Sequence, residues 1–158
     1  MSAASIAPDA PADTASPAAE SGAGDLRASS LEIQFPDGLV GLPRCRHFLL
    51  SRAAAPGTFW LESVDTEGLA FLLVDPFPFF DDYSVQLAEE DLRALGGGTP
   101  ADIAVLAIVT LPGEPGGTCT ANLQAPLAFN LRTGRARQIV LPRSDFGVRC
   151  PLAWDLAA

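Results

Sequence analysis

The chain has a single histidine, His47, which is the first candidate for chemistry. An imidazole works as a general base near neutral pH, and a hydrolase would need it beside a carboxylate such as Asp65 or Asp82. The residues around His47 match no motif that pairs a nucleophile with a base. We therefore favour a structural or surface role for His47, and we keep a small hydrolytic enzyme that uses it as an alternative.

Two adjacent carboxylates, Asp81 and Asp82, are the second candidate. Paired carboxylates do acid–base work when burial separates their pKa values. Neighbouring residues of an extended segment point to opposite faces, however, so these two side chains do not readily flank one substrate. The pattern favours a solvated acidic turn or a surface that recognises a basic partner.

Cysteine and glycine patterns disfavour metal and nucleotide chemistry. The three cysteines, Cys45, Cys119 and Cys150, are odd in number and contain no C-x-x-C pair, which disfavours a disulfide framework or a cysteine zinc site. The glycine-rich segments 96–98 and 113–117 lack the spacing of a phosphate-binding loop. We expect reduced thiols, no metal and no cofactor.

Charge argues against nucleic acid as a direct partner. The formal net charge is −9, and residues 62–102 hold ten acidic residues and one arginine. Such a surface repels phosphate and steers a basic protein toward it. The sequence shows no secretory signal and no apolar run of membrane length, so we expect a cytoplasmic protein that does not contact the membrane.

The chain divides into a tail and one folded domain. Residues 1–24 are rich in Ala, Pro and Ser, and Ile6 is their only large apolar residue after Met1. Such a segment cannot bury enough surface to offset its ordering entropy, so we predict a disordered tail over 1–24. The remaining residues, about 25–155, are long enough for a single domain with its own core.

Short apolar and alternating runs dominate the domain and predict strands. The strand candidates are residues 31–35, 47–50, 58–64, 69–74, 103–111, 119–123, 127–131 and 136–141. One helix is expected over 88–95, with acidic residues in its first turn and Gly96 after its end, and a single helical turn over 99–102. This pattern predicts a mainly β fold, a small antiparallel β-barrel-like single domain with one or two short helices.

A generic ligand-binding barrel is a second alternative, because it needs only a sizeable apolar cavity. The side chains expected inside the barrel are bulky, and side chains fill small barrels. This expected interior set, which argues against a cavity, is Phe71, Leu73, Val105, Ile108, Phe129 and Ile139.

The order of several motifs resembles the flagellar assembly factor FliW family. The matching stretches are residues 35–41, 60–65, 69–77, 79–83, 102–110, 120–126, 138–141 and 144–152, which together cover about 24–152. The chain departs from the family pattern in its N-terminal tail, in a less hydrophobic first strand around 24–26, and in Cys150, where the family usually has a histidine.

The resemblance implies a small cytoplasmic β-barrel chaperone and regulator with no catalytic activity. FliW-like proteins bind the translational repressor CsrA and the flagellin subunit in a partner switch. Flagellin holds FliW until it is exported, and the freed FliW then binds CsrA, so that flagellin translation resumes. The family is described as acting non-competitively with RNA. We expect a monomer with these two protein partners.

The same resemblance implies a set of partner-binding residues. Apolar anchors beside acids suit an interface with a basic partner, which points to Phe79, Phe80, Asp81, Asp82, Tyr83 and Ser84. Thr120 and Asn122 lie on the strand face opposite Cys119, Ala121 and Leu123, and we expect them to bind a partner or to form hydrogen bonds within the sheet.

Overall fold

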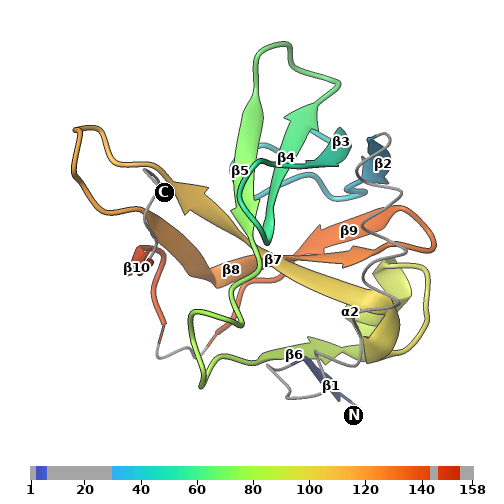
Figure 1. Ribbon diagram of the computed structural model, residues 1–158. Helices are drawn as coiled ribbons and strands as arrows, with labels where there is room; N and C mark the ends of the chain where they lie inside the picture. Colours follow the sequence, from blue (N-terminus) through green and yellow to red (C-terminus); the bar gives the residue numbers. More distant parts are fainter. Residues whose placement is uncertain (1–2, 7–29, 143–145, 154–158) are drawn as a thin grey trace.

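The protein is a closed β-barrel with a second layer packed on one side. The computed structural model describes residues 3–6, 30–142 and 146–153 of the chain (Figure 1). Seven strands pair in the ring β8-β7-β5-β4-β3-β2-β9, and β9 pairs again with β8. These strands are β2 (Leu31–Gln34), β3 (His47–Arg52), β4 (Thr58–Ser63), β5 (Ala70–Val74), β7 (Ile103–Thr110), β8 (Thr120–Asn130) and β9 (Arg135–Gln138).

The remaining elements lie outside this ring. Strand β10 (Cys150–Pro151) pairs with β8, and β1 (Ala3–Ile6) pairs with β6 (Val85–Ala88) in a separate antiparallel sheet. Helix α2 (Glu89–Ala94) follows β6 directly, and the short helix η2 (Pro100–Asp102) leads into β7. The predicted fold class is therefore confirmed, and so are the helix and the single helical turn.

The barrel interior is filled with apolar side chains. All seven strands or their ends contribute to this inner core, and Phe35 lies at its centre with its ring centroid 5.2 Å from that of Phe48 and 5.8 Å from that of Phe129. Both ring pairs meet edge to face, an arrangement that aromatic quadrupoles favour. The packing of these rings disfavours the ligand-binding barrel.

A second, outer core covers the outside of β7 and β8. Side chains along β7 alternate between the two cores, since Val105 and Ala107 enter the outer core and Leu106 enters the inner one. The sequence-based assignment of Val105 and Ile139 to the barrel interior was therefore wrong. Both lie in the outer core, because β6, α2 and the C-terminal segments cover a face that the apolar pattern alone cannot distinguish from the interior.

The predicted strands 119–123 and 127–131 form one continuous strand, β8. The register of β8 against β7 shifts between Leu106 and Ile108, as at a β-bulge, and this shift lets the two segments continue as one strand. Pro126 has no N–H to donate, and its carbonyl accepts a hydrogen bond from the Ile139 amide at 2.8 Å. The strand thus continues through the proline and closes the barrel against β9.

The predicted tail is described only in part. Residues 3–6 form β1 and are paired, whereas residues 7–24 lie outside the described residues, so the tail boundary stays a prediction. No helix in the described ranges is long and apolar enough to cross a membrane.

Asn130, at the end of β8, joins the two layers through its buried amide. Its Nδ2 donates to the carbonyls of Leu95 and Gly97, each at 3.1 Å, and its Oδ1 accepts from the amides of Arg132 and Thr133 at 3.0 and 3.3 Å. The side chain thus forms hydrogen bonds both with the end of α2 and with the turn into β9. These bonds explain why a polar side chain is buried here, with only 2% of its surface exposed.

We predict that Asn130→Ala lowers the free energy of unfolding by about 2–3 kcal/mol, because it leaves buried carbonyl and amide groups without partners. Urea denaturation measures the loss. The control is Asn122→Ala on the same strand, where one hydrogen bond to the Ala125 amide is removed and a loss of about 1 kcal/mol is expected. Equal losses in the two variants would contradict this role of Asn130.

Candidate functional site

The predicted binding segment, residues 79–84, is a compact turn between β5 and β6. The Pro76 carbonyl accepts hydrogen bonds from the amides of Phe79 and Phe80 at 3.0 and 3.1 Å, and the Phe80 carbonyl accepts one from the Tyr83 amide at 3.1 Å. These bonds fold the chain back over the outer core. The segment is therefore held by its own backbone before any partner arrives.

Tyr83 anchors this turn to the barrel. It is 1% exposed, and its hydroxyl donates a hydrogen bond of 2.7 Å to the Leu123 carbonyl on β8. Its ring centroid lies 5.8 Å from that of Phe77 and 5.2 Å from that of Phe146. Burial raises the pKa of Tyr83 well above its usual range, so the phenol stays neutral. The side chain positions the segment and is not available as a surface contact.

The other residues of the turn divide into anchors and exposed groups. Phe79 and Phe80 are half-buried and pack against the outer core, and the Phe80 ring centroid lies 5.9 Å from that of Phe146. Asp81, Asp82 and Ser84 are exposed. Neither aspartate has an ion-pair or hydrogen-bond partner among the described residues, so their charges face solvent.

Thr120 and Asn122 do not join this surface. Both are half-buried on β8, and their neighbours Ala121 and Leu123 point into the outer core beneath the turn. Thr120 and Asn122 therefore lie on the opposite face of the sheet. The Asn122 Oδ1 accepts a hydrogen bond from the Ala125 amide at 3.1 Å, which is the within-sheet role that the sequence left open.

The acids of α2 are partly neutralised. The Arg137 guanidinium lies 3.3 Å from the Asp91 carboxylate, 3.6 Å from Glu90 and 3.6 Å from Asp37. These contacts tie the helix to β9. Asp81 and Asp82 therefore differ from Glu90 and Asp91 in presenting charge that no described arginine offsets.

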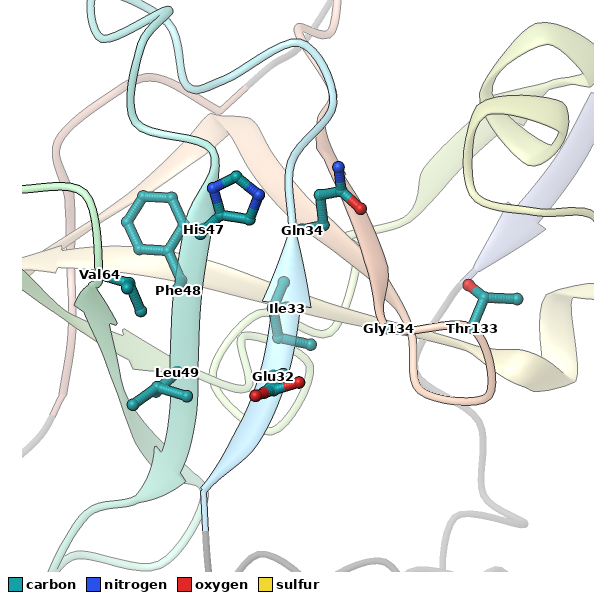
Figure 2. Close-up of a pocket in the computed structure, with 9 residues that line it drawn as sticks. All are labelled: Glu32, Ile33, Gln34, His47, Phe48, Leu49, Val64, Thr133 and Gly134. Carbon is teal, nitrogen blue, oxygen red and sulfur yellow. The ribbon is translucent and has the colours of Figure 1, made fainter.

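A pocket that the sequence did not predict lies on the far side of the barrel from the turn of residues 79–84, which we call the acidic turn. It has a volume of about 380 Å³, and Figure 2 shows side chains of β2 and β3 around it together with the turn before β9. Sequence reasoning missed it because it depends on the parallel pairing of β2 with β9. Its lining residues are Glu32, Ile33, Gln34, His47, Phe48, Leu49, Val64, Thr133 and Gly134.

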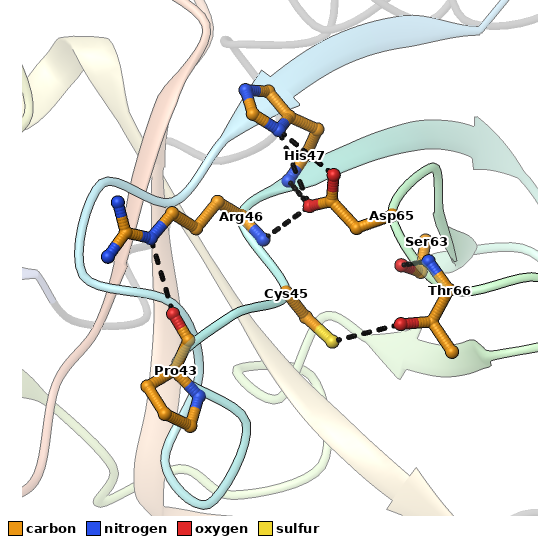
Figure 3. A network of polar contacts seen from close by, with 7 residues as sticks. All are labelled: Pro43, Cys45, Arg46, His47, Ser63, Asp65 and Thr66. Atoms are coloured by element: carbon orange, nitrogen blue, oxygen red, sulfur yellow. Dashed lines mark hydrogen bonds and ion pairs between the residues drawn. The ribbon is translucent and has the colours of Figure 1, made fainter.

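His47 stands at the rim of this pocket and is paired with Asp65 (Figure 3). Its Nδ1 lies 3.2 Å from Asp65 Oδ1, so Asp65 rather than Asp82 is the carboxylate beside the histidine. Asp65 Oδ2 also accepts hydrogen bonds from the amides of Arg46 and His47, at 2.8 and 2.9 Å. These backbone bonds lower the pKa of Asp65, and they join the β4–β5 turn to the start of β3.

This arrangement does not favour the hydrolase alternative. The thiol of Cys45 is buried and lies 3.5 Å from Thr66 Oγ1, and Thr133 is the hydroxyl residue among those that line the pocket. A base without a nucleophile at hydrogen-bond distance lacks the geometry for covalent catalysis. In the part of the chain that the structure describes, no group of three His, Cys, Asp or Glu side chains is placed to hold a metal ion.

Comparison with known proteins gives a consistent result. A family model described as "FliW protein" matches residues 18–152. The flagellar assembly factor FliW of Syntrophotalea carbinolica is 41% identical over 121 residues, which are 76% of this chain and 85% of the relative. That of Natranaerobius thermophilus is 36% identical over 124 residues, or 78% of this chain and 82% of the relative.

The fold agrees with a solved structure. A crystal structure of the flagellar assembly factor FliW superposes with a TM-score of 0.71 at 28% identity, and the match covers 79% of this chain and 87% of the other.

We predict that Asp65→Asn removes part of the pH dependence of stability. Folding lowers the pKa of Asp65 below its ordinary value of 3.8, so the carboxylate stabilises the fold above that pH and the contribution is lost as the pH falls through the lowered pKa. Urea midpoints should therefore differ more between wild type and variant at pH 7 than at pH 3. Glu67→Gln, in the same turn, is the control. A difference of the same size at pH 3 and at pH 7 would contradict this assignment.

Proposed function

The chain belongs to the FliW protein family, and from this membership we propose that it is a regulatory binding protein of flagellar assembly that binds the translational repressor CsrA and the flagellin subunit. The proposed action is non-enzymatic. One observation carries it, the exposed Asp81–Asp82 pair on a turn that Tyr83 and two phenylalanines anchor to the outer core. A preformed acidic surface with apolar neighbours suits a basic protein partner.

Antagonism of CsrA follows from charge. A protein with a formal net charge of −9, docked on an RNA-binding protein, adds negative potential that opposes the approach of phosphate. This effect does not require the RNA-binding face itself to be covered. We propose that the chain therefore acts non-competitively with RNA, as a cytoplasmic monomer without direct contact to nucleic acid.

Flagellin is the proposed second partner, in a switch. While flagellin accumulates it would hold the protein, and its export would free the protein to bind CsrA and so restore flagellin translation. Such a switch needs only two mutually exclusive complexes with different lifetimes. No bond is made or broken in this scheme.

The residues take different proposed roles. Asp81, Asp82 and Ser84 would contact the partner directly, and Phe79 and Phe80 would offer their exposed edges. Tyr83 would act by positioning the turn, since its own side chain is buried. Thr120 and Asn122 remain proposed contacts, and we propose that they belong to a separate surface on the opposite face of the sheet.

We predict that titration calorimetry with purified CsrA, and separately with flagellin, gives saturable heat at low micromolar concentration. The double variant Asp81→Lys/Asp82→Lys should weaken the CsrA complex by about tenfold or more, equivalent to about 1.4 kcal/mol. The loss should appear partly as a slower association that depends on salt, because these charges steer the encounter.

The matched control is Glu62→Lys/Glu67→Lys, which reverses two exposed acids on the β4–β5 hairpin. It should change the affinity far less. Equal weakening by both double variants would show that only the net charge matters. Unchanged binding of Asp81→Lys/Asp82→Lys would show that the turn is not part of the interface. Absence of heat from the wild-type protein with both partners would overturn the proposed function.

A further inference from the structure

Strand β6 continues directly from the acidic turn and lies outside the barrel sheet, with one face buried and the other exposed. Its side chains alternate, with Val85 and Leu87 fully buried in the outer core and Gln86 and Ala88 exposed. It belongs to neither edge of the barrel sheet. Among the described residues its only strand partner is β1, in the two-stranded sheet that Figure 1 shows beside β7 and α2.

The pairing of β1 with β6 is short and comes from a distant part of the chain. Ala3 pairs with Ala88 and Ile6 with Val85 in an antiparallel register of four residues. The family match begins at residue 18, so it includes β6 but not β1. The strand that covers this edge is therefore supplied from outside the part of the chain that defines the family.

We propose that the edge of β6 is a strand-addition site for an extended segment of a protein partner, and that β1 is an occupant from the same chain that this segment displaces. A backbone edge held in extended form by buried side chains is the feature that strand addition requires. The inference deepens the proposed function, since the edge and the acidic turn form one continuous surface over residues 81–88.

Charge at the two ends of β6 indicates the chemistry of the segment. Asp81 and Asp82 precede the strand and Glu89 follows it, and all three are exposed. The four residues of β6 span roughly 13 Å at the usual rise of a strand. A partner strand with small or apolar residues at its centre and Lys or Arg at both ends would place its charges beside these acids.

The chain's own segment lacks this complementarity. From Met1 to Ala7 the sequence has no charged side chain, and the first one is the acidic Asp9. Its side chains therefore offer no basic group to the acidic ends of the site. A two-stranded pairing of only four residue pairs opens at a small free energy. The apparent affinity for a partner is then reduced by the fraction of molecules in which β1 occupies the edge.

The test disrupts β1 and leaves the rest of the chain intact. In the variant Ala4→Pro/Ser5→Pro, two adjacent residues lose their backbone N–H groups. Because alternate residues of a strand direct their N–H groups to the same neighbour, one of the two lost groups is a donor that faces β6. The matched control is Ala15→Pro/Ser16→Pro, which makes the same two substitutions at an Ala-Ser pair outside β1. Amide hydrogen exchange of the full chain, followed by NMR, should be at least tenfold faster at the β6 amides that face β1 in the first variant and unchanged in the control.

Two blocked synthetic peptides then serve as probes. One has the sequence of residues 1–8, and the other places two lysines on each side of Ala-Ala-Ser-Ile. The lysine-flanked peptide should shift the β6 amide signals and bind at least fivefold more tightly than the neutral one, by a margin that shrinks as salt rises. It should also bind the first proline variant more tightly than it binds the wild type.

Three results would overturn the proposal. They are equal exchange at β6 in wild type and variant, the absence of β6 shifts with either peptide in the variant, and a concentration-dependent wild-type dimer that the variant lacks, which would make a second copy the occupant. None of these measurements uses CsrA or flagellin. A failure here therefore leaves the calorimetric test of the proposed function standing, and the reverse also holds.

Discussion

The structure depends on the burial of β7 and β8 on both faces. A strand of a small barrel normally faces the interior on one side and solvent on the other, but Val105, Ala107 and Val109 on β7 are as apolar as their inward neighbours. That outer face must be covered. The segments that cover it are the turn at 77–84, β6, α2 and the described residues 139–142 and 146–152, so the second layer exists because of the sequence of β7.

This constraint explains where the proposed docking turn lies and why it is ordered. The covering segments are pinned by buried groups, since the Tyr83 hydroxyl reaches the Leu123 carbonyl and the Asn130 amide holds the end of α2. A surface that is already fixed loses little conformational entropy on binding. The exposed aspartates can therefore be used for recognition without a cost for ordering the turn, and the adjacent β6 edge extends the same platform.

The sequence was most informative where one periodicity dominated. The seven strands of the barrel, the helix after β6 and the one-turn helix before β7 follow from alternation, glycine stops and acidic first turns. The short strands β1, β6 and β10 were not among the predicted strands. The Asp65 partner of His47 was one of the two carboxylates considered. The sequence did not predict which apolar residues lie in which of the two cores, because neighbours such as Val105 and Leu106 are both apolar. Three further features depend on long-range strand register and were therefore not predicted. They are the burial of Tyr83, the location of Thr120 and Asn122 on the sheet face opposite residues 79–84, and the pocket beside β2.

The anchored turn of residues 79–84 and strand β6 are the proposed surface through which this protein acts. Hydrogen–deuterium exchange of the full chain, with and without saturating CsrA and read by mass spectrometry, tests it most directly. We expect slower exchange over residues 79–88 in the complex and unchanged exchange in β2 and β3 around the pocket. Slower exchange confined to β2 and β3, with residues 79–88 unaffected, would contradict it.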